Sequence, residues 1–203
     1  YGLTIPPEND APVVSNLDAA ITRSTYSALP IDNDVFINDP DLGFSGDYNG
    51  YSLTISTATA TGGSAFDSIV FAPGFIAELT HDAANHRFVH TASGAVVATY
   101  SSDVQATGVT FTLNFTSVPA YIHNAGTVRA LVQRLAYQRT GDLDVHPATL
   151  TLTYTLNDGS GAGNATTAQD VVVTLTGNTA PAILDVVDNY FQLSETAINS
   201  GYV

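Results

Sequence analysis

Residues 150–156 read Leu-Thr-Leu-Thr-Tyr-Thr-Leu, a strict alternation of apolar and polar side chains. Successive side chains of a β-strand point to opposite faces of a sheet, so this stretch predicts a strand with one buried and one solvated face. The other stretches with this alternation are 51–55, 109–115 and 171–175, with shorter runs at 68–72, 87–90 and 95–100. Gly, Asn, Asp and Ser cluster between the runs, as in turns. The pattern predicts an all-β chain.

One segment follows a different period. Between residues 127 and 138 the apolar side chains recur at helical spacing, at Val128, Leu131, Val132, Leu135 and Ala136. This spacing forms one stripe along an α-helix, and Gly141 follows at a position that could end it. The sequence therefore predicts one short helix at about 127–138, packed against a β-sandwich.

The composition fits a folded β-protein. The chain has 203 residues, enough for one large domain or two small ones with a buried core. Hydrophobic residues make up 44%, which excludes a disordered tail. The 26 Thr and 19 Val residues favour pleated, half-buried surfaces.

The charge is strongly acidic. The chain has 16 Asp and three Glu against five Arg and no Lys, a formal net charge of -14. Such a surface repels nucleic acid and anionic membranes, and no apolar run reaches the roughly 20 residues of a membrane span. Dense carboxylates suit Ca²⁺, although acidity also serves solubility alone. With no Cys, the chain has neither a disulfide nor a thiolate metal site.

No local motif nominates an active site, so we expect no enzyme. The Gly-x-Ser-x-Gly pattern of a nucleophile elbow is absent. The glycine-rich stretch 158–163 precedes a strand rather than a helix, which indicates a hairpin loop and not a dinucleotide site. His81, His86 and His90 are too far apart along a strand to share one ion, so isolated surface histidines are the better interpretation.

Two similar proline-containing segments divide the chain. Asn9-Asp10-Ala11-Pro12 near the start matches Asn178-Thr179-Ala180-Pro181 near the end. Proline stops strand pairing and stiffens a junction, so we interpret both segments as linkers between modules. On this interpretation residues 1–8 are the last strand of a preceding module, 9–177 a complete module, and 178–203 the start of a following one.

The order of these features resembles a known family. An Asn-Asp-Ala-Pro linker, Asp39-Pro40-Asp41, a mid-chain helix, the strand and turn at 150–161, and a second linker follow one another. This order is similar to the cadherin-like and immunoglobulin-like tandem repeats of giant bacterial surface proteins, including RTX-type adhesins. The resemblance covers most of residues 9–183. It implies an immunoglobulin-like or cadherin-like β-sandwich and an extracellular location on the cell surface.

In such repeats Ca²⁺ lies at the module junctions and stiffens the array. Carried over to this chain, the resemblance implies a ligand set of Asn9, Asp10, Asp39, Asp41, Asp158 and, in the following module, Glu195. Asp32 and Asp34 add carboxylates shortly before Asp39. The chain also departs from the family: residues 22–26 lack the Glu expected after the first linker, and Thr179 replaces the linker Asp in the second.

Three functions remain open at this point. The first is a structural repeat of a calcium-dependent adhesin, a rigid spacer or presenting unit. Its partners would be neighbouring modules, together with a cell-surface glycan or protein where the module presents an adhesive surface. The second is a subunit of an extracellular filament in which identical subunits join by adding terminal strands to a neighbour's sheet. The third is a carbohydrate-binding module, in which Tyr48 and Tyr51 would replace the absent Trp.

Overall fold

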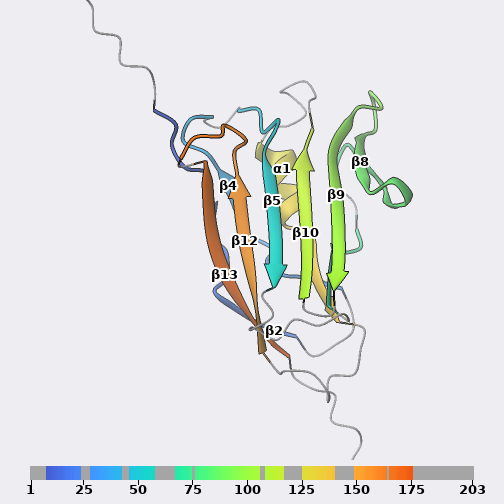
Figure 1. Ribbon diagram of the computed structural model, residues 1–203. Coiled ribbons are helices and arrows are strands. Elements are labelled where there is room, and N and C mark those ends of the chain that lie inside the picture. The colour runs from blue at the N-terminus through green and yellow to red at the C-terminus, as the bar shows by residue number, and fades with distance from the viewer. Residues whose placement is uncertain are drawn as a thin grey trace, which may run out of the picture.

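The computed structural model describes residues 8–23, 28–42, 46–57, 67–74, 76–105, 108–116, 125–139, 149–163 and 165–175. β-Strands dominate this part of the chain and one α-helix accompanies them, which confirms the all-β prediction (Figure 1). The strands are β1 (Val13–Ser15), β2 (Ala20–Arg23), β3 (Leu29–Pro30), β4 (Phe36–Asn38), β5 (Ser52–Thr57), β6 (Asp67–Phe71), β7 (Leu79–Asp82), β8 (Arg87–His90), β9 (Val96–Gln105), β10 (Gly108–Phe115), β11 (Leu135–Arg139), β12 (Thr149–Asn157) and β13 (Thr166–Leu175). The helices are α1 (Ala125–Val132) and the 3-10 turn η3 (Ala83–Asn85).

Eight strands form one large sheet in the order β2-β13-β12-β5-β10-β9-β8-β7. Neighbouring strands run antiparallel except β2 and β13, which are parallel and lie far apart in the sequence. Every stretch predicted as a strand from its alternation falls on one of the strands of the structure. In Figure 1 this sheet faces the viewer, with β13 and β12 on one side and β9 and β8 on the other.

Strand β12 shows why the alternating sequence folds in this way. Leu150, Leu152, Tyr154 and Leu156 are buried, whereas the threonines between them are only partly covered. β12 pairs with β5 on one side and β13 on the other, so its backbone groups are satisfied within the sheet. One face of the sheet therefore supplies a continuous row of apolar side chains to the core.

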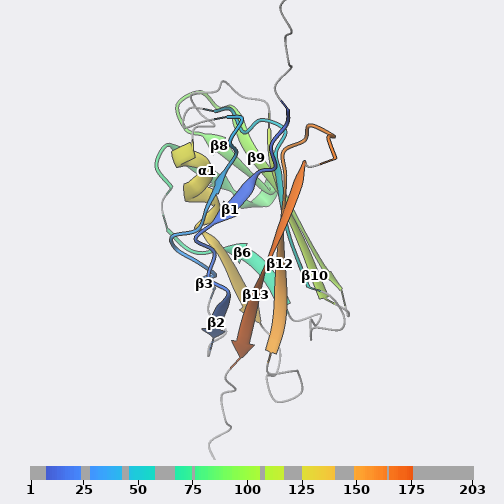
Figure 2. The ribbon, with the colours of Figure 1, turned by 90° about the vertical axis from the view of Figure 1, so that its left-hand side faces the viewer.

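A second layer covers this apolar face. It contains the antiparallel pair β1 and β4, the three-stranded sheet β3-β11-β6, and helix α1. Figure 2 shows these elements together on one side of the large sheet. Val128, Leu131 and Val132 of α1 are fully buried in the shared core, which therefore lies between the two layers.

The helix is shorter at its C-terminal end than the sequence predicts. α1 ends at Val132, and residues 135–138 of the predicted helix belong to β11 instead. Leu135, Ala136 and Tyr137 are all buried, and β11 pairs with β3 on one side and β6 on the other. Strand pairing on both sides therefore overrides the helical spacing of Leu135 and Ala136.

Several predictions lie outside the described residues. These are the strand within residues 1–7, the second linker at 178–181, the module start at 178–203, and the helix-ending role of Gly141. The first linker is described from Glu8 onward, and it leads directly into β1.

Candidate functional site

Five of the six residues predicted as calcium ligands belong to one hydrogen-bond network. The amide Nδ2 of Asn9 donates to Asp158 Oδ2 at 2.9 Å and to the backbone oxygen of Asp10 at 3.2 Å. The backbone N–H of Asp10 donates to Asp41 Oδ2 at 2.8 Å. The first linker thus joins two loops that lie more than 100 residues apart in the sequence. The sixth residue, Glu195, lies outside the described residues.

The segment after β4 places Asp39 inside the protein and Asp41 at its surface. Asp39 is only 1% exposed, whereas Asp41 is exposed. Asp39 Oδ1 accepts from the backbone N–H of Asp41 at 2.8 Å, a local turn that fixes the loop. Asp39 Oδ2 accepts from the hydroxyl of Tyr51 at 2.7 Å. A buried carboxylate is therefore held by two donors, neither of which is positively charged.

Asp158 begins the loop that joins β12 to β13. Its carboxylate accepts from the backbone N–H of Ser160 at 2.7 Å as well as from Asn9. Burial alone would oppose its ionisation, but the hydrogen bonds from Ser160 and Asn9 outweigh this and hold the pKa of Asp158 below its usual value. Asp158 therefore carries its negative charge at neutral pH.

Tyr51 is the site residue that the ligand prediction missed. Burial, followed by the hydrogen bond to Asp39 and the charges of Asp39 and Asp158, raises the pKa of its hydroxyl far above the usual value. Tyr51 packs edge-on against Tyr48, with ring centroids 5.1 Å apart. Both rings are buried, so neither offers a face to a sugar, and the carbohydrate-binding role considered for them is wrong. No local sequence signal distinguishes Tyr51 from an ordinary core tyrosine.

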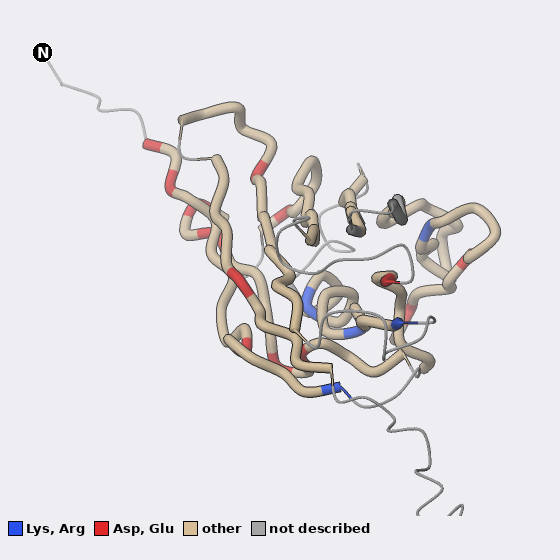
Figure 3. The backbone as a smooth tube through the Cα atoms, turned by 60° about the horizontal axis from the view of Figure 1, so that its bottom comes forward, with Lys and Arg blue, Asp and Glu red and all other residues tan. Residues whose placement is uncertain are grey.

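The network concentrates negative charge without a matching cation. It contains the carboxylates of Asp10, Asp39, Asp41 and Asp158. Ion pairs in the described part of the chain join Arg87 to Asp82 and Arg139 to Asp67, so none involves these four aspartates. In Figure 3 several acidic positions lie at the end where the described chain begins, and the arginine positions lie away from that end, among the other acidic positions.

The donor chemistry of this network suits a hard cation, because Ca²⁺ is held by carboxylate and carbonyl oxygens. Its carboxylates are spread over the two loops and the linker, and each hydrogen-bonded oxygen keeps a further lone pair. However, within the described ranges no three or more His, Cys, Asp or Glu side chains are close enough to form a metal centre. The arrangement is an acidic, oxygen-rich surface and not a closed cage.

Asp32 and Asp34 take part in a different network. Asp32 is buried and accepts from the backbone N–H groups of Asp18, Asp34 and Val35 at 2.7–2.8 Å. Burial opposes the ionisation of Asp32, but these donors lower its pKa overall. The hydrogen bond with Asp32 raises the pKa of Asp34. Asp32 therefore serves as a loop-organising acceptor beside β2 and β4.

The three histidines, His81, His86 and His90, have separate structural roles. His81 hydrogen-bonds to the hydroxyl of Tyr100 at 2.8 Å, and His90 contacts Ser93 Oγ at the same distance. His86 adopts a left-handed conformation at the end of η3, where it turns the chain into β8. Each side chain thus has a local structural setting in the β7–β8 region.

Comparison of the chain with protein-family models and with curated protein sequences gives no match. The family resemblance therefore depends on the sequence features alone. None of the described helices has the length and apolar character needed to cross a membrane.

Proposed function

We propose that this chain is a structural repeat module of an extracellular, calcium-dependent surface array, with an immunoglobulin-like or cadherin-like β-sandwich fold. The observation that carries the proposal is the hydrogen bonding of the first linker to Asp41 and Asp158, with Asp39 joined to Asp41 and without an arginine partner. Ca²⁺ would supply the missing positive charge, and the module would act as a rigid spacer or presenting unit for adhesion.

The position of the acidic network supports this role. A linker that contacts two loops at one end of a module lies where a neighbouring module would begin. Ca²⁺ requires six to eight oxygen ligands, more than this side of a junction offers in close proximity. In the single chain, water would complete the shell. A neighbouring module would replace part of that water with its own oxygens, and the ion would then bridge the two modules and restrict motion at the linker.

Calcium-dependent melting tests the proposal. An ion that binds only the native state stabilises it by about 2.7 kcal/mol when its concentration is about 100 times Kd. For a chain of this size that stabilisation corresponds to a rise in Tm of roughly 5–10 °C. We expect this rise when calcium replaces excess chelator, measured by circular dichroism at constant ionic strength. The same Tm in both conditions would overturn the proposal.

Two variants test whether the calcium-dependent rise in Tm comes from the acidic network. Asp41→Asn removes one exposed carboxylate of the network and should reduce the calcium-dependent rise in Tm. Asp170→Asn is the matched control, because Asp170 is exposed on β13 and its carboxylate accepts a hydrogen bond from Thr153 Oγ1 at 2.7 Å, outside the acidic network. The control should keep the full rise, and an equal loss in both variants would indicate a general charge effect.

A further inference from the structure

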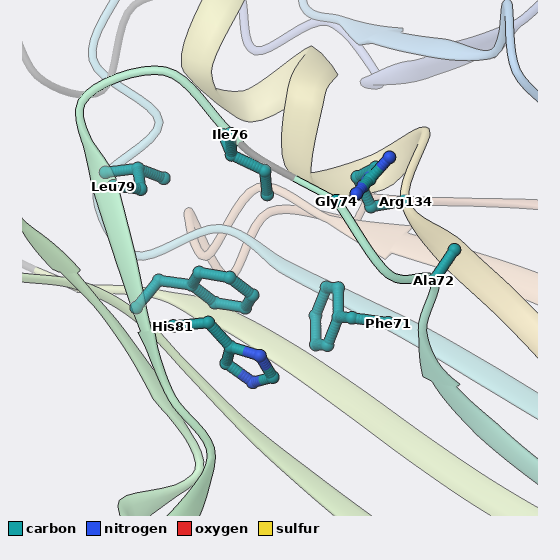
Figure 4. Close-up of a pocket in the computed structure, with 8 residues that line it drawn as sticks. Phe71, Ala72, Gly74, Ile76, Leu79, His81 and Arg134 are labelled. Atoms are coloured by element: carbon teal, nitrogen blue, oxygen red, sulfur yellow. The ribbon is translucent and has the colours of Figure 1, made fainter.

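A separate cavity of about 190 Å³ lies at the other edge of the large sheet, beside β7 and β8. It lies between the end of β6, the segment that follows it, β7 and β8, and the turn after α1. Its described lining consists of Phe71, Ala72, Gly74, Ile76, Leu79, His81, Phe88 and Arg134. Figure 4 shows the rings of Phe71 and His81 on one side of the space, and Ile76 and Leu79 on another.

Arg134 supplies the only formal charge of this described lining. Its Nη2 atom is buried and has no hydrogen-bond partner among the described residues. A buried donor without an acceptor is unfavourable, and more so when it belongs to a charged group. The side chain therefore presents an unused anion-binding group at the cavity in a chain of net charge -14.

The close approach of Gly74 positions this guanidinium. A Cβ atom at Gly74 would lie 1.7 Å from Arg134 Nη2, and Gly74 has φ +136°, which side-chain-bearing residues rarely adopt. Glycine thus gives Arg134 the room to lie against the segment that borders the cavity. Figure 4 shows Gly74 and the Arg134 side chain directly beside each other.

Aromatic rings form the opposite part of the cavity. His81 stacks on Phe88 with ring centroids 4.5 Å apart and an interplanar angle of 10°. Phe71 meets Phe88 edge-on at 4.6 Å. Desolvation lowers the pKa of His81, so its ring is neutral at pH 7 and adds no second charge. The cavity therefore combines one cation with flat apolar walls.

We infer that this cavity binds a small carboxylate whose body is a single apolar or aromatic ring. The carboxylate pairs with the guanidinium of Arg134, which can donate two parallel hydrogen bonds. The ring packs against Phe71, Phe88 and Ile76. The volume agrees with this size, because a cavity of roughly 150 Å³ holds benzene and drug-sized ligands need about 300–1,000 Å³.

Titration with benzoate, followed by NMR of the Ile76 and Leu79 methyl groups, tests the inference. We expect saturable shifts with benzoate. Benzamide has the same ring without the charge, so it should bind about tenfold or more weakly, as expected for loss of a charge-assisted hydrogen bond. The absence of saturable shifts with benzoate, or equal affinity for both compounds, would overturn the inference. This comparison uses the unaltered chain.

Variants of two arginines test the role of the guanidinium. Arg134→Gln should lower benzoate affinity about tenfold or more while leaving the weak benzamide affinity unchanged. Arg129→Gln removes an equal charge from an exposed position on α1 and should leave benzoate affinity unchanged. Undiminished benzoate binding by a folded Arg134→Gln protein would contradict the inference. All titrations contain chelator, so their outcome is separate from the calcium proposal.

Discussion

At the scale of single residues, the most consequential contact is a buried ion pair between the small-sheet strands β6 and β11. Asp67 is 0% exposed and Arg139 is 2% exposed. Arg139 Nε donates to Asp67 Oδ1 at 2.6 Å and Nη2 donates to Oδ2 at 3.1 Å. The hydroxyl of Tyr137 also donates to Asp67. Burial and the contact with Asp67 raise the pKa of Tyr137, so it remains a donor.

Replacing Arg139 with methionine should strongly destabilise the protein. The substitution leaves the Asp67 carboxylate buried without its cation, and removing one partner of a buried pair typically costs about 3–5 kcal/mol. Urea denaturation followed by circular dichroism measures this loss. The double variant Arg139→Met, Asp67→Leu should recover much of the stability, because no charge then remains buried. A single variant as stable as the unaltered chain would show that Asp67 is not a buried anion.

An ion pair at the protein surface provides the control for the Arg139→Met measurement. Arg87 Nε lies 2.8 Å from Asp82 Oδ2, but the two side chains are 40% and 26% exposed. Solvent screens such pairs and their side-chain entropy opposes ordering. Arg87→Met should therefore change the free energy of unfolding far less than Arg139→Met.

At the scale of elements, the loop between β12 and β13 connects the sheet to the candidate calcium site. Asp158 starts this loop, and its backbone N–H bonds to the oxygen of Ala165 at 3.0 Å. Gly159 and Gly161 both have positive φ, of 75° and 73°. A Cβ at Gly159 would lie 2.7 Å from the backbone oxygen of Gly50, whereas one at Gly161 would meet nothing within 4 Å.

Alanine substitutions at these two glycines should separate backbone strain from close contact. Gly161→Ala carries only the left-handed backbone penalty, roughly 1–2 kcal/mol. Gly159→Ala carries that penalty and a clash with Gly50, so its loss of unfolding free energy should be larger. It should also weaken calcium-dependent stabilisation by displacing Asp158. Equal destabilisation, measured by urea denaturation, would mean that the loop moves away from Gly50 freely.

At the scale of the whole molecule, charge is distributed unevenly. Several acidic positions lie together at one end, where Figure 3 shows no arginine, and the net charge is -14. Repulsion among like charges opposes the compact state, and dissolved salt screens it. The candidate calcium site and the Arg134 cavity belong to opposite parts of this distribution.

Sodium chloride should raise Tm without added calcium. Screening strengthens as the Debye length falls from about 10 Å at 0.1 M to about 3 Å at 1 M salt. Differential scanning calorimetry in excess chelator measures the rise. Asp41→Asn should show a smaller salt effect, because it removes one charge from the acidic end. A Tm that falls with added salt would contradict the view that self-repulsion limits stability.

The sequence by itself determined most strands of the large sheet, though not its edge strands β2 and β7 or the strand order. Strict alternation, as in residues 150–156, leaves one arrangement that buries every apolar side chain, and β12 adopts it. The sequence also singled out the aspartates of the candidate calcium site, because Asp-Pro-Asp and the linker resemble a known pattern. These residue types and their spacing can be identified in the sequence without knowledge of their three-dimensional contacts.

Only the tertiary structure decided the end of the helix and the composition of the sites. Leu135 and Ala136 fit a helical stripe, but pairing of β11 with both β3 and β6 places them in a strand. The contacts of Asn9 with Asp158 and of Gly74 with Arg134 join residues that no local pattern relates. Alternation and turn chemistry act between near neighbours in the chain, whereas strand partners and site contacts depend on long-range packing.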